Sequence, residues 1–124
     1  MPNHIHLVWK IKEPNLLENV QRDFLKFTSQ MIKFDLVKNH PDVLLQFLSE
    51  RKDRQYQFWQ DRSYIKQMFN KKIVEQKIEY MNNNPLSKKW NLVSKPEDYK
   101  FSSAKFYLQN IDDWGFIKHY SEDC

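Results

Sequence analysis

The sequence predicts one domain of the α+β class, residues 1–124, from three observations. The run of residues 4–11 begins with polar and apolar side chains in alternation, which is typical of a half-buried strand. Later segments place apolar residues at intervals of three and four, which is typical of amphipathic helices. A chain of 124 residues suffices for one modest domain but not for two.

The predicted strand carries two histidines on one face. In an extended backbone His4 and His6 point the same way, whereas Ile5, Leu7 and Trp9 point the other way. A histidine pair of this spacing is weak evidence by itself, because it suits a metal or catalytic pair and, more often, the solvent face of a strand. A lone strand leaves both rows of backbone groups unpaired, so either further short strands are present or the pairing partners are missing.

Two helical segments and a connection follow the strand. After a break at residues 13–15, residues 17–31 have the pattern of an amphipathic helix. Residues 42–48 favour a short helix, and residues 50–56 favour an exposed connection.

A third helical pattern begins near residues 65–71. It ends at Pro85, because proline disfavours helical geometry in the residue before it. Residues 96–104 then predict a turn followed by a short helix capped by serine.

Tyr80, Lys77 and Asn84 lie on one side of this third helix. Val74 and Ile78 mark its apolar face, and Tyr80 lies about 120° round from them. Spacing alone favours a structural role, in which Tyr80 packs at the helix edge and Asn84 caps the C-terminus. For Lys77, a phosphate contact and an ordinary exposed lysine are equally compatible with the pattern.

The composition indicates a folded, basic protein. Hydrophobic residues make up 40% and aromatic residues 15%, which argues against disorder. Lys and Arg number 20 and Asp and Glu 16, and this net charge of +4 does not by itself establish a nucleic-acid partner. Cations and aromatic residues alternate around residues 51–66, a pattern that suits single-stranded DNA, although the same rings could form core.

The sequence also favours a reducing compartment. Its one cysteine, Cys124, has no intramolecular disulfide partner. No apolar run reaches the length of a membrane span, and the N-terminus lacks the regions of a signal peptide. We therefore expect a cytoplasmic protein without a membrane partner.

Five motifs together resemble one family. The segment Met1-Pro2-Asn3-His4-Ile5-His6-Leu7 resembles the His-hydrophobic-His (HUH) motif of the IS200-like single-tyrosine transposases, in particular the REP-associated tyrosine transposases. The other motifs follow in the family's order and extend the resemblance over nearly the whole chain: Lys26-Phe27-Thr28-Ser29, Phe58-Trp59-Gln60, Tyr80 to Pro85, and Pro96-Glu97-Asp98-Tyr99 with Ser102-Ser103. Tyr64 and Asn82 depart from the pattern, because family members often carry histidine there.

The resemblance implies a ferredoxin-like antiparallel sheet with helices. In family domains at least one strand and one helix precede the histidine strand, whereas here that strand starts almost at Met1. We therefore expect an N-terminally truncated domain that lacks its N-terminal strand or strands and helix.

The resemblance also implies nicking and strand transfer on single-stranded, hairpin-bearing DNA. By motif position, Tyr80 is the nucleophile, which forms a 5′-phosphotyrosine link and leaves a free 3′-OH. His4, His6 and Asn84 are the expected ligands of a divalent metal, Mg²⁺ or Mn²⁺, that polarises the phosphate. The residues expected to contact the DNA are Lys26, Arg54, Lys77 and Lys88.

Two other functions stay open. The chain could be a catalytically inactive DNA-binding remnant of such a transposase, or a hydrolytic metal nuclease in which Tyr80 is structural. A homodimer is also open, since related enzymes include both dimers and monomers.

Overall fold

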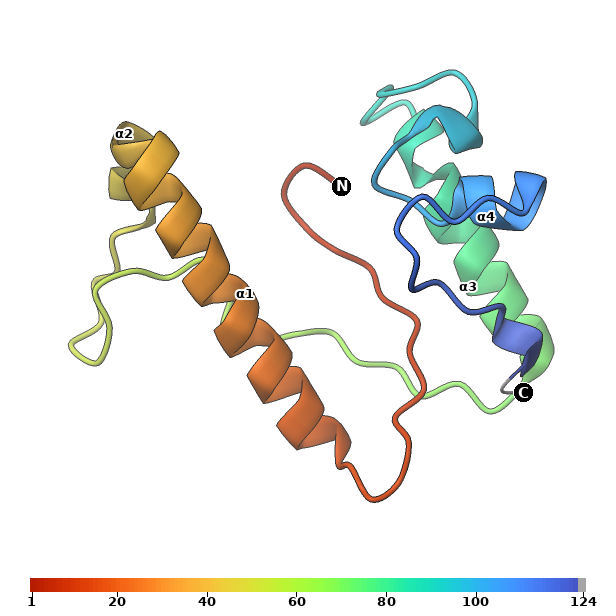
Figure 1. The fold of residues 1–124 in the computed structure, drawn as a ribbon, viewed down its shortest axis with the longest axis horizontal. Coiled ribbons are helices and arrows are strands. Elements are labelled where there is room, and N and C mark those ends of the chain that lie inside the picture. Colours follow the sequence, from red (N-terminus) through yellow and green to blue (C-terminus); the bar gives the residue numbers. More distant parts are fainter. Residues whose placement is uncertain (123–124) are drawn as a thin grey trace. The chain divides into compact units, whose positions relative to one another are not determined.

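The computed structural model describes residues 1–122, so Cys124 lies outside the described residues. The chain divides into two compact units (Figure 1). The terminal unit comprises residues 1–10 and the chain from Lys66 onward, and the central unit is Ile11–Ile65.

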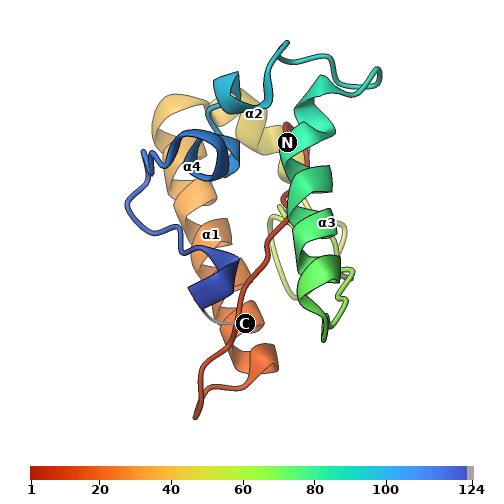
Figure 2. The same ribbon diagram turned by 90° about the vertical axis from the view of Figure 1, so that its right-hand side faces the viewer.

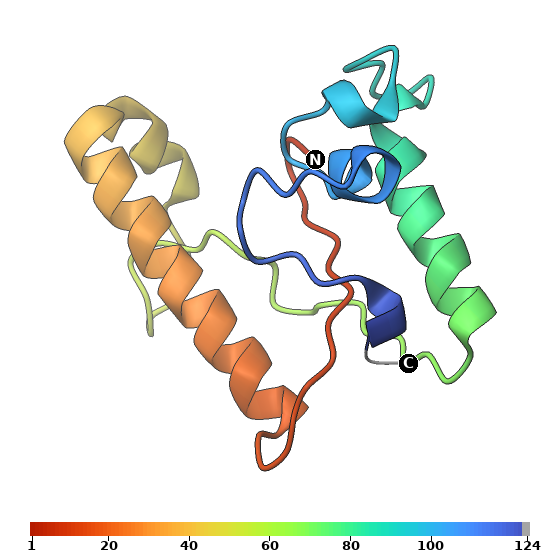
Figure 3. The same cartoon turned by 45° about the vertical axis from the view of Figure 1, so that its right-hand side comes forward.

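Three helical segments form the central unit: α1 (Leu17–Asn39), α2 (Pro41–Leu44) and η1 (Leu45–Phe47). Pro41 suits the first position of α2, since its φ is already fixed near the helical value and its missing N–H has no partner there. In Figure 3, α2 lies beside the last turns of α1. The predicted helix at residues 17–31 is confirmed and continues to Asn39. No helix within residues 1–122 has both the length and the apolar character needed to cross a membrane.

The side chain of Trp59 fastens the segment after η1 to α1. Its indole Nε1 donates to Thr28 Oγ1 at 2.9 Å, and the Thr28 hydroxyl donates to the carbonyl of Phe24 at 2.8 Å. Leu44 is buried, whereas α1 contributes no buried residue and Phe27 is 63% exposed. The apolar stripe predicted on α1 therefore exists but is mostly uncovered.

Up to residue 122, the terminal unit contains five helical elements: α3 (Lys71–Asn83), η2 (Asn84–Leu86), η3 (Pro96–Asp98), α4 (Ala104–Gln109) and η4 (Tyr120–Glu122). Asn70 begins α3, because its side chain accepts a hydrogen bond from the Lys72 N–H at 2.8 Å. The predicted end near Pro85 is confirmed, since the chain there tightens into η2. The buried side chains come from α3, η2 and α4: Val74, Ile78, Asn82, Pro85 and Ala104.

The predicted ferredoxin-like antiparallel sheet, and with it the α+β class, is wrong. Helices make up 48% and strand 2% of the structure, and no sheet is present within residues 1–122. The strand content is one isolated antiparallel bridge between Leu48 and Tyr56. Residues 4–11, predicted to be a strand, are drawn without an arrow (Figure 2).

The reason for this difference is backbone pairing. An extended segment becomes a strand only where a neighbouring segment accepts and donates its ladder hydrogen bonds. No segment of the described chain pairs in this way with residues 4–11. Alternation in the sequence predicts which side chains share a face, but it does not supply a pairing partner.

Candidate active site

Tyr80 lies off the buried face of α3. That face is formed by Val74, Ile78 and Asn82, which are 8%, 7% and 9% exposed. Tyr80 is 60% exposed, as its angular position in the helix predicts. Its hydroxyl is therefore accessible from solvent, and the side chain contributes little to the core.

Ring contacts bring both histidines to Tyr80. The centroids of the His4 and His6 rings are 4.9 Å apart with planes at 86°, and those of His6 and Tyr80 are 6.3 Å apart at 77°. The centroids of the His4 and Trp90 rings are 5.7 Å apart. Two segments that are distant in sequence, residues 1–10 and α3, thus supply one cluster.

The environment of His6 favours its neutral form. Burial lowers the pKa of His6 from its ordinary value of 6.5, and the positive charges of His4 and the N-terminus lower it further. His4 Nδ1 lies 2.7 Å from Asn3 Oδ1, an atom that only accepts, so this ring nitrogen donates and the contact orients the imidazole. A neutral imidazole is the form that binds metal ions.

Lys77 and Asn84 stand on either side of Tyr80 along the chain. The Nζ of Lys77 lies 5.9 Å from the centroid of the Tyr80 ring, within the range of a cation–π contact. Asn84 is half-buried at the C-cap of α3, where its carbonyl accepts from the Ser87 N–H at 3.1 Å. Among the described interactions none joins the Asn84 side chain to either histidine. Asn84 therefore has the capping position that its spacing favours.

The residues present fit a divalent metal in part. Two imidazoles suit Mn²⁺, whereas Mg²⁺ prefers a shell of oxygen atoms. Residues 1–122 contain no group of three or more His, Cys, Asp or Glu side chains that could hold a metal ion. The remaining ligands would have to be amide, phosphate or water oxygens.

The buried side chain of Asn82 joins α3 to the segment before α4. Its Oδ1 accepts from Ser103 Oγ at 2.8 Å and, more weakly, from Ser102 Oγ at 3.5 Å. Ser102 Oγ also accepts from the Ala104 N–H at 2.9 Å, whereas Ser103, the N-cap residue of α4, makes no capping hydrogen bond with its side chain. A pocket of about 80 Å³ lies between these residues and His6. The buried amide thus ties the half of α3 that carries Tyr80 to the start of α4.

Three residues of this cluster were not predicted from the sequence. Asn3 could have been found, because it is adjacent to His4 in the sequence. The burial of Asn82 could also have been found, since it lies eight residues after Val74 on the same helical face. Trp90 had no such signal, because its place depends on the turn in which its N–H donates to the carbonyl of Ser87 at 3.0 Å.

The predicted DNA contacts fall in both units. Lys77 and Lys88 belong to the terminal unit and are exposed. Lys26, on α1, and Arg54 belong to the central unit and are also exposed. Tyr64, which departs from the family pattern, belongs to the central unit as well and is 91% exposed.

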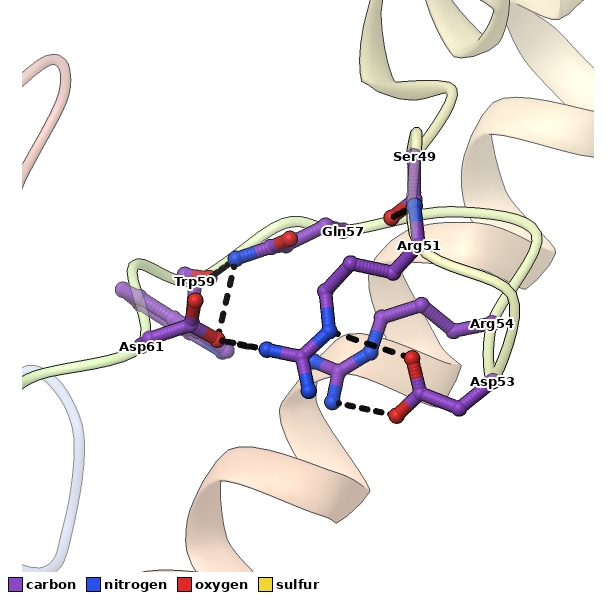
Figure 4. A network of polar contacts seen from close by, with 7 residues as sticks. All are labelled: Ser49, Arg51, Asp53, Arg54, Gln57, Trp59 and Asp61. Atoms are coloured by element: carbon purple, nitrogen blue, oxygen red, sulfur yellow. Dashed lines mark hydrogen bonds and ion pairs between the residues drawn. The ribbon is translucent and has the colours of Figure 1, made fainter.

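Arg54 is part of a network of ion pairs (Figure 4). Its Nη2 lies 3.1 Å from Asp53 Oδ2, and Arg51 bonds both Asp53, at 3.1 Å, and Asp61, at 3.0 Å. Hydrogen bonds from Arg54 and Arg51 hold the pKa of Asp53 below its ordinary value. A DNA phosphate would therefore compete with carboxylates for Arg54, whereas no ion pair engages Lys77 or Lys88 in the described part of the chain.

Comparison with known proteins yields no relative: no family model, no curated protein and no solved structure matches this chain.

Proposed function

We propose that this protein nicks and rejoins single-stranded, hairpin-bearing DNA through a 5′-phosphotyrosine intermediate, in the manner of the IS200-like single-tyrosine transposases. The observation that carries the proposal is the contact of His6 with Tyr80. Two motifs that resemble that family lie far apart in the sequence, and both contribute to one cluster of side chains. A merely structural tyrosine at the helix edge would not need a histidine pair beside it.

Tyr80 is the proposed nucleophile. Its oxygen forms a bond to phosphorus while the bond from phosphorus to the 3′ oxygen breaks, and the phenolic proton passes through solvent to the departing 3′ oxygen. Rejoining is the reverse exchange and needs no nucleotide cofactor, because the phosphotyrosine link keeps the energy of the broken bond. The 60% exposure of Tyr80 suits a nucleophile that must meet a large substrate.

The neighbouring side chains have separate proposed roles. His4 and His6 would hold a divalent metal ion, Mg²⁺ or Mn²⁺, with Asn84 as the proposed third ligand. When bound, such an ion polarises a phosphate oxygen and stabilises its developing charge. Lys77, beside the Tyr80 ring, offsets the negative charge of the phosphate.

Covalent trapping tests the proposal. The protein is incubated with Mn²⁺ or Mg²⁺ and a labelled hairpin oligonucleotide. The label is on the 3′ side of the cut, which is the part that would stay linked to the tyrosine through its 5′ phosphate. Adducts are resolved under denaturing conditions. We expect an adduct with the natural chain and none with Tyr80→Phe. Tyr64→Phe is the matched control, since Tyr64 is even more exposed but has no ring contact with a histidine in the described part of the chain, and this variant should form the adduct. An adduct that survives Tyr80→Phe would refute the assignment, and cleavage without any adduct would favour the hydrolytic nuclease.

A second candidate function is DNA binding without catalysis. It would require no metal ion. Exposed lysines beside aromatic rings, such as Lys77 at Tyr80 and Lys89 at Trp90, would still bind a phosphate backbone. This function predicts hairpin binding that weakens with salt and is unchanged in His4→Ala and Tyr80→Phe.

A homodimer is also part of the proposal, and sedimentation of the protein with and without DNA tests it.

A further inference from the structure

An exposed pair of aromatic rings lies next to the candidate site in the terminal unit. The rings of Phe101 and Trp114 stack with their centroids 5.9 Å apart and their planes at 29°. Phe101 is 66% exposed and Trp114 is 41% exposed. Packing in the core therefore does not account for aromatic side chains at these two positions. Phe101 also lines the pocket of about 80 Å³ that His6 and Asn82 line. Phe101 is therefore continuous with the surface around His6, whose ring contacts Tyr80.

Hydrogen bonds hold this pair in a fixed position. The indole Nε1 of Trp114 donates to the carbonyl of Lys100 at 3.2 Å, and its backbone N–H donates to Asp112 Oδ1 at 3.0 Å. Asp112 Oδ2 accepts a further hydrogen bond from the Ile117 N–H at 2.8 Å. Because the loop is held on both sides, a flat ligand can stack on Phe101 with little loss of conformational freedom.

The charges around the pair favour an anionic ligand on the Phe101 side. Lys100 Nζ lies 5.8 Å from the centroid of the Phe101 ring. The nearby carboxylate of Asp113 is paired with Lys105 Nζ at 2.8 Å, which leaves it little net charge. A separate pocket on the Trp114 side has both signs of charge, because Lys100 and Lys105 line it together with Glu97, Asp98 and Asp113. A ligand with flat rings and a negative backbone therefore suits the face that Phe101 presents.

We propose that Phe101, backed by Trp114, is a stacking subsite for an unpaired base of single-stranded DNA whose backbone passes Lys100 on its way to Tyr80. The inference rests on the DNA binding in the proposed function, but not on catalysis. Stacking on an aromatic ring accepts any base, since every base has a π-face. The subsite therefore selects unpaired over paired DNA, and not one sequence over another.

Equilibrium binding tests the subsite without catalysis. The Tyr80→Phe protein is titrated, without divalent metal, into a labelled hairpin with an unpaired tail and into the same hairpin without the tail. We expect Phe101→Leu to weaken binding of the tailed hairpin about tenfold, because leucine keeps the apolar volume but cannot stack. Binding of the tailless hairpin should not change. Phe101→Trp should bind the tailed hairpin at least as tightly as the parent.

Phe116→Leu is the matched control, since Phe116 is 76% exposed in the same unit and lies in no described ring contact. It should bind both hairpins like the parent. Equal affinity of the parent and Phe101→Leu for the tailed hairpin would overturn the inference, as would an equal loss for both hairpins in a variant whose circular dichroism is unchanged. Adduct formation is measured separately, so failure of the subsite and failure of the proposed reaction give different results.

Discussion

The ring of His6 lies 6.3 Å from the ring of Tyr80, with the two planes at 77°. An edge-to-face arrangement of this kind is the geometry that aromatic rings prefer. The contact attaches residues 1–10 to α3 although no strand ladder is present in the described part of the chain. Side chains, rather than backbone hydrogen bonds, therefore position the candidate metal ligands.

A double-mutant cycle measures this attachment. We expect the pair His6→Ala and Tyr80→Ala to show a coupling of about 0.5 kcal/mol in the free energy of unfolding, as for other aromatic pairs. The same cycle with His6→Ala and Tyr107→Ala is the control, because Tyr107 contacts His119 and Tyr120 instead. Equal coupling free energies for the two pairs would contradict a specific contact between His6 and Tyr80.

Asn82 should be the most sensitive polar residue of the site. Asn82→Ala leaves the Ser103 hydroxyl without its buried acceptor, so we expect a loss of about 1–3 kcal/mol in the free energy of unfolding, measured by chemical denaturation. Asn83→Ala is the control, since Asn83 is exposed and, among residues 1–122, its side chain bonds only the carbonyl of Glu79, at 3.0 Å. Its loss should stay below about 0.5 kcal/mol. Similar losses for the two variants would show that Asn82 has no anchoring role.

The helices could be predicted from the sequence because their signals are local. The cap at Asn70 and the stop at Pro85 lie within a few residues of the segment that they limit, and both ends of α3 follow from them. A strand depends instead on a partner elsewhere in the chain. Residues 4–11 have the side-chain pattern of a strand, but the described chain provides no partner, and the predicted sheet is absent.

The candidate site shows the same division between local and distant signals. The exposure of Tyr80 and the cap position of Asn84 follow from helical geometry alone. The place of His6 beside Tyr80 was expected only through the resemblance, and that of Trp90 beside His4 was not expected at all. Contacts between distant segments depend on packing, which periodicity does not encode.

Thr28 is predicted to contribute to the stability of the central unit. Thr28→Val keeps the shape of the side chain but removes the acceptor of the Trp59 indole N–H, which is only partly exposed. We expect a loss of about 1–2 kcal/mol in the free energy of unfolding, with a red shift of tryptophan emission. Ser29→Ala, one residue along α1, should change neither quantity, and an effect equal to that of Thr28→Val would contradict the assignment.

Asn3 should matter for metal affinity if the proposed function is right. Its Oδ1 fixes the proton of His4 on Nδ1, so Asn3→Ala frees the ring to rotate and change tautomer. We expect Mn²⁺ binding, followed by electron paramagnetic resonance, to weaken about tenfold. Ser121→Ala is the matched control, because Ser121 makes the corresponding contact with His119 Nδ1 at 2.6 Å. Equal Mn²⁺ affinity in the natural chain and Asn3→Ala would refute this role.

Asp112 should make the stacking pair sensitive to acid. Although loss of hydration opposes ionisation, the backbone N–H groups of residues 114–117 lower the pKa of Asp112 below its ordinary value of 3.8. The folded state then binds fewer protons than the unfolded state. The ionised Asp112 carboxylate therefore stabilises the folded state fully above pH 3.8, and this contribution is lost as the pH falls through the lowered pKa. We expect Asp112→Asn to lower the Tm at neutral pH, and the difference from the natural chain to shrink below that value. Asp113→Asn, which removes only an exposed pair with Lys105, should lower the Tm less. A Tm difference for Asp112→Asn that is the same at pH 7 and at strongly acidic pH would show that these hydrogen bonds do not depend on the ionised carboxylate.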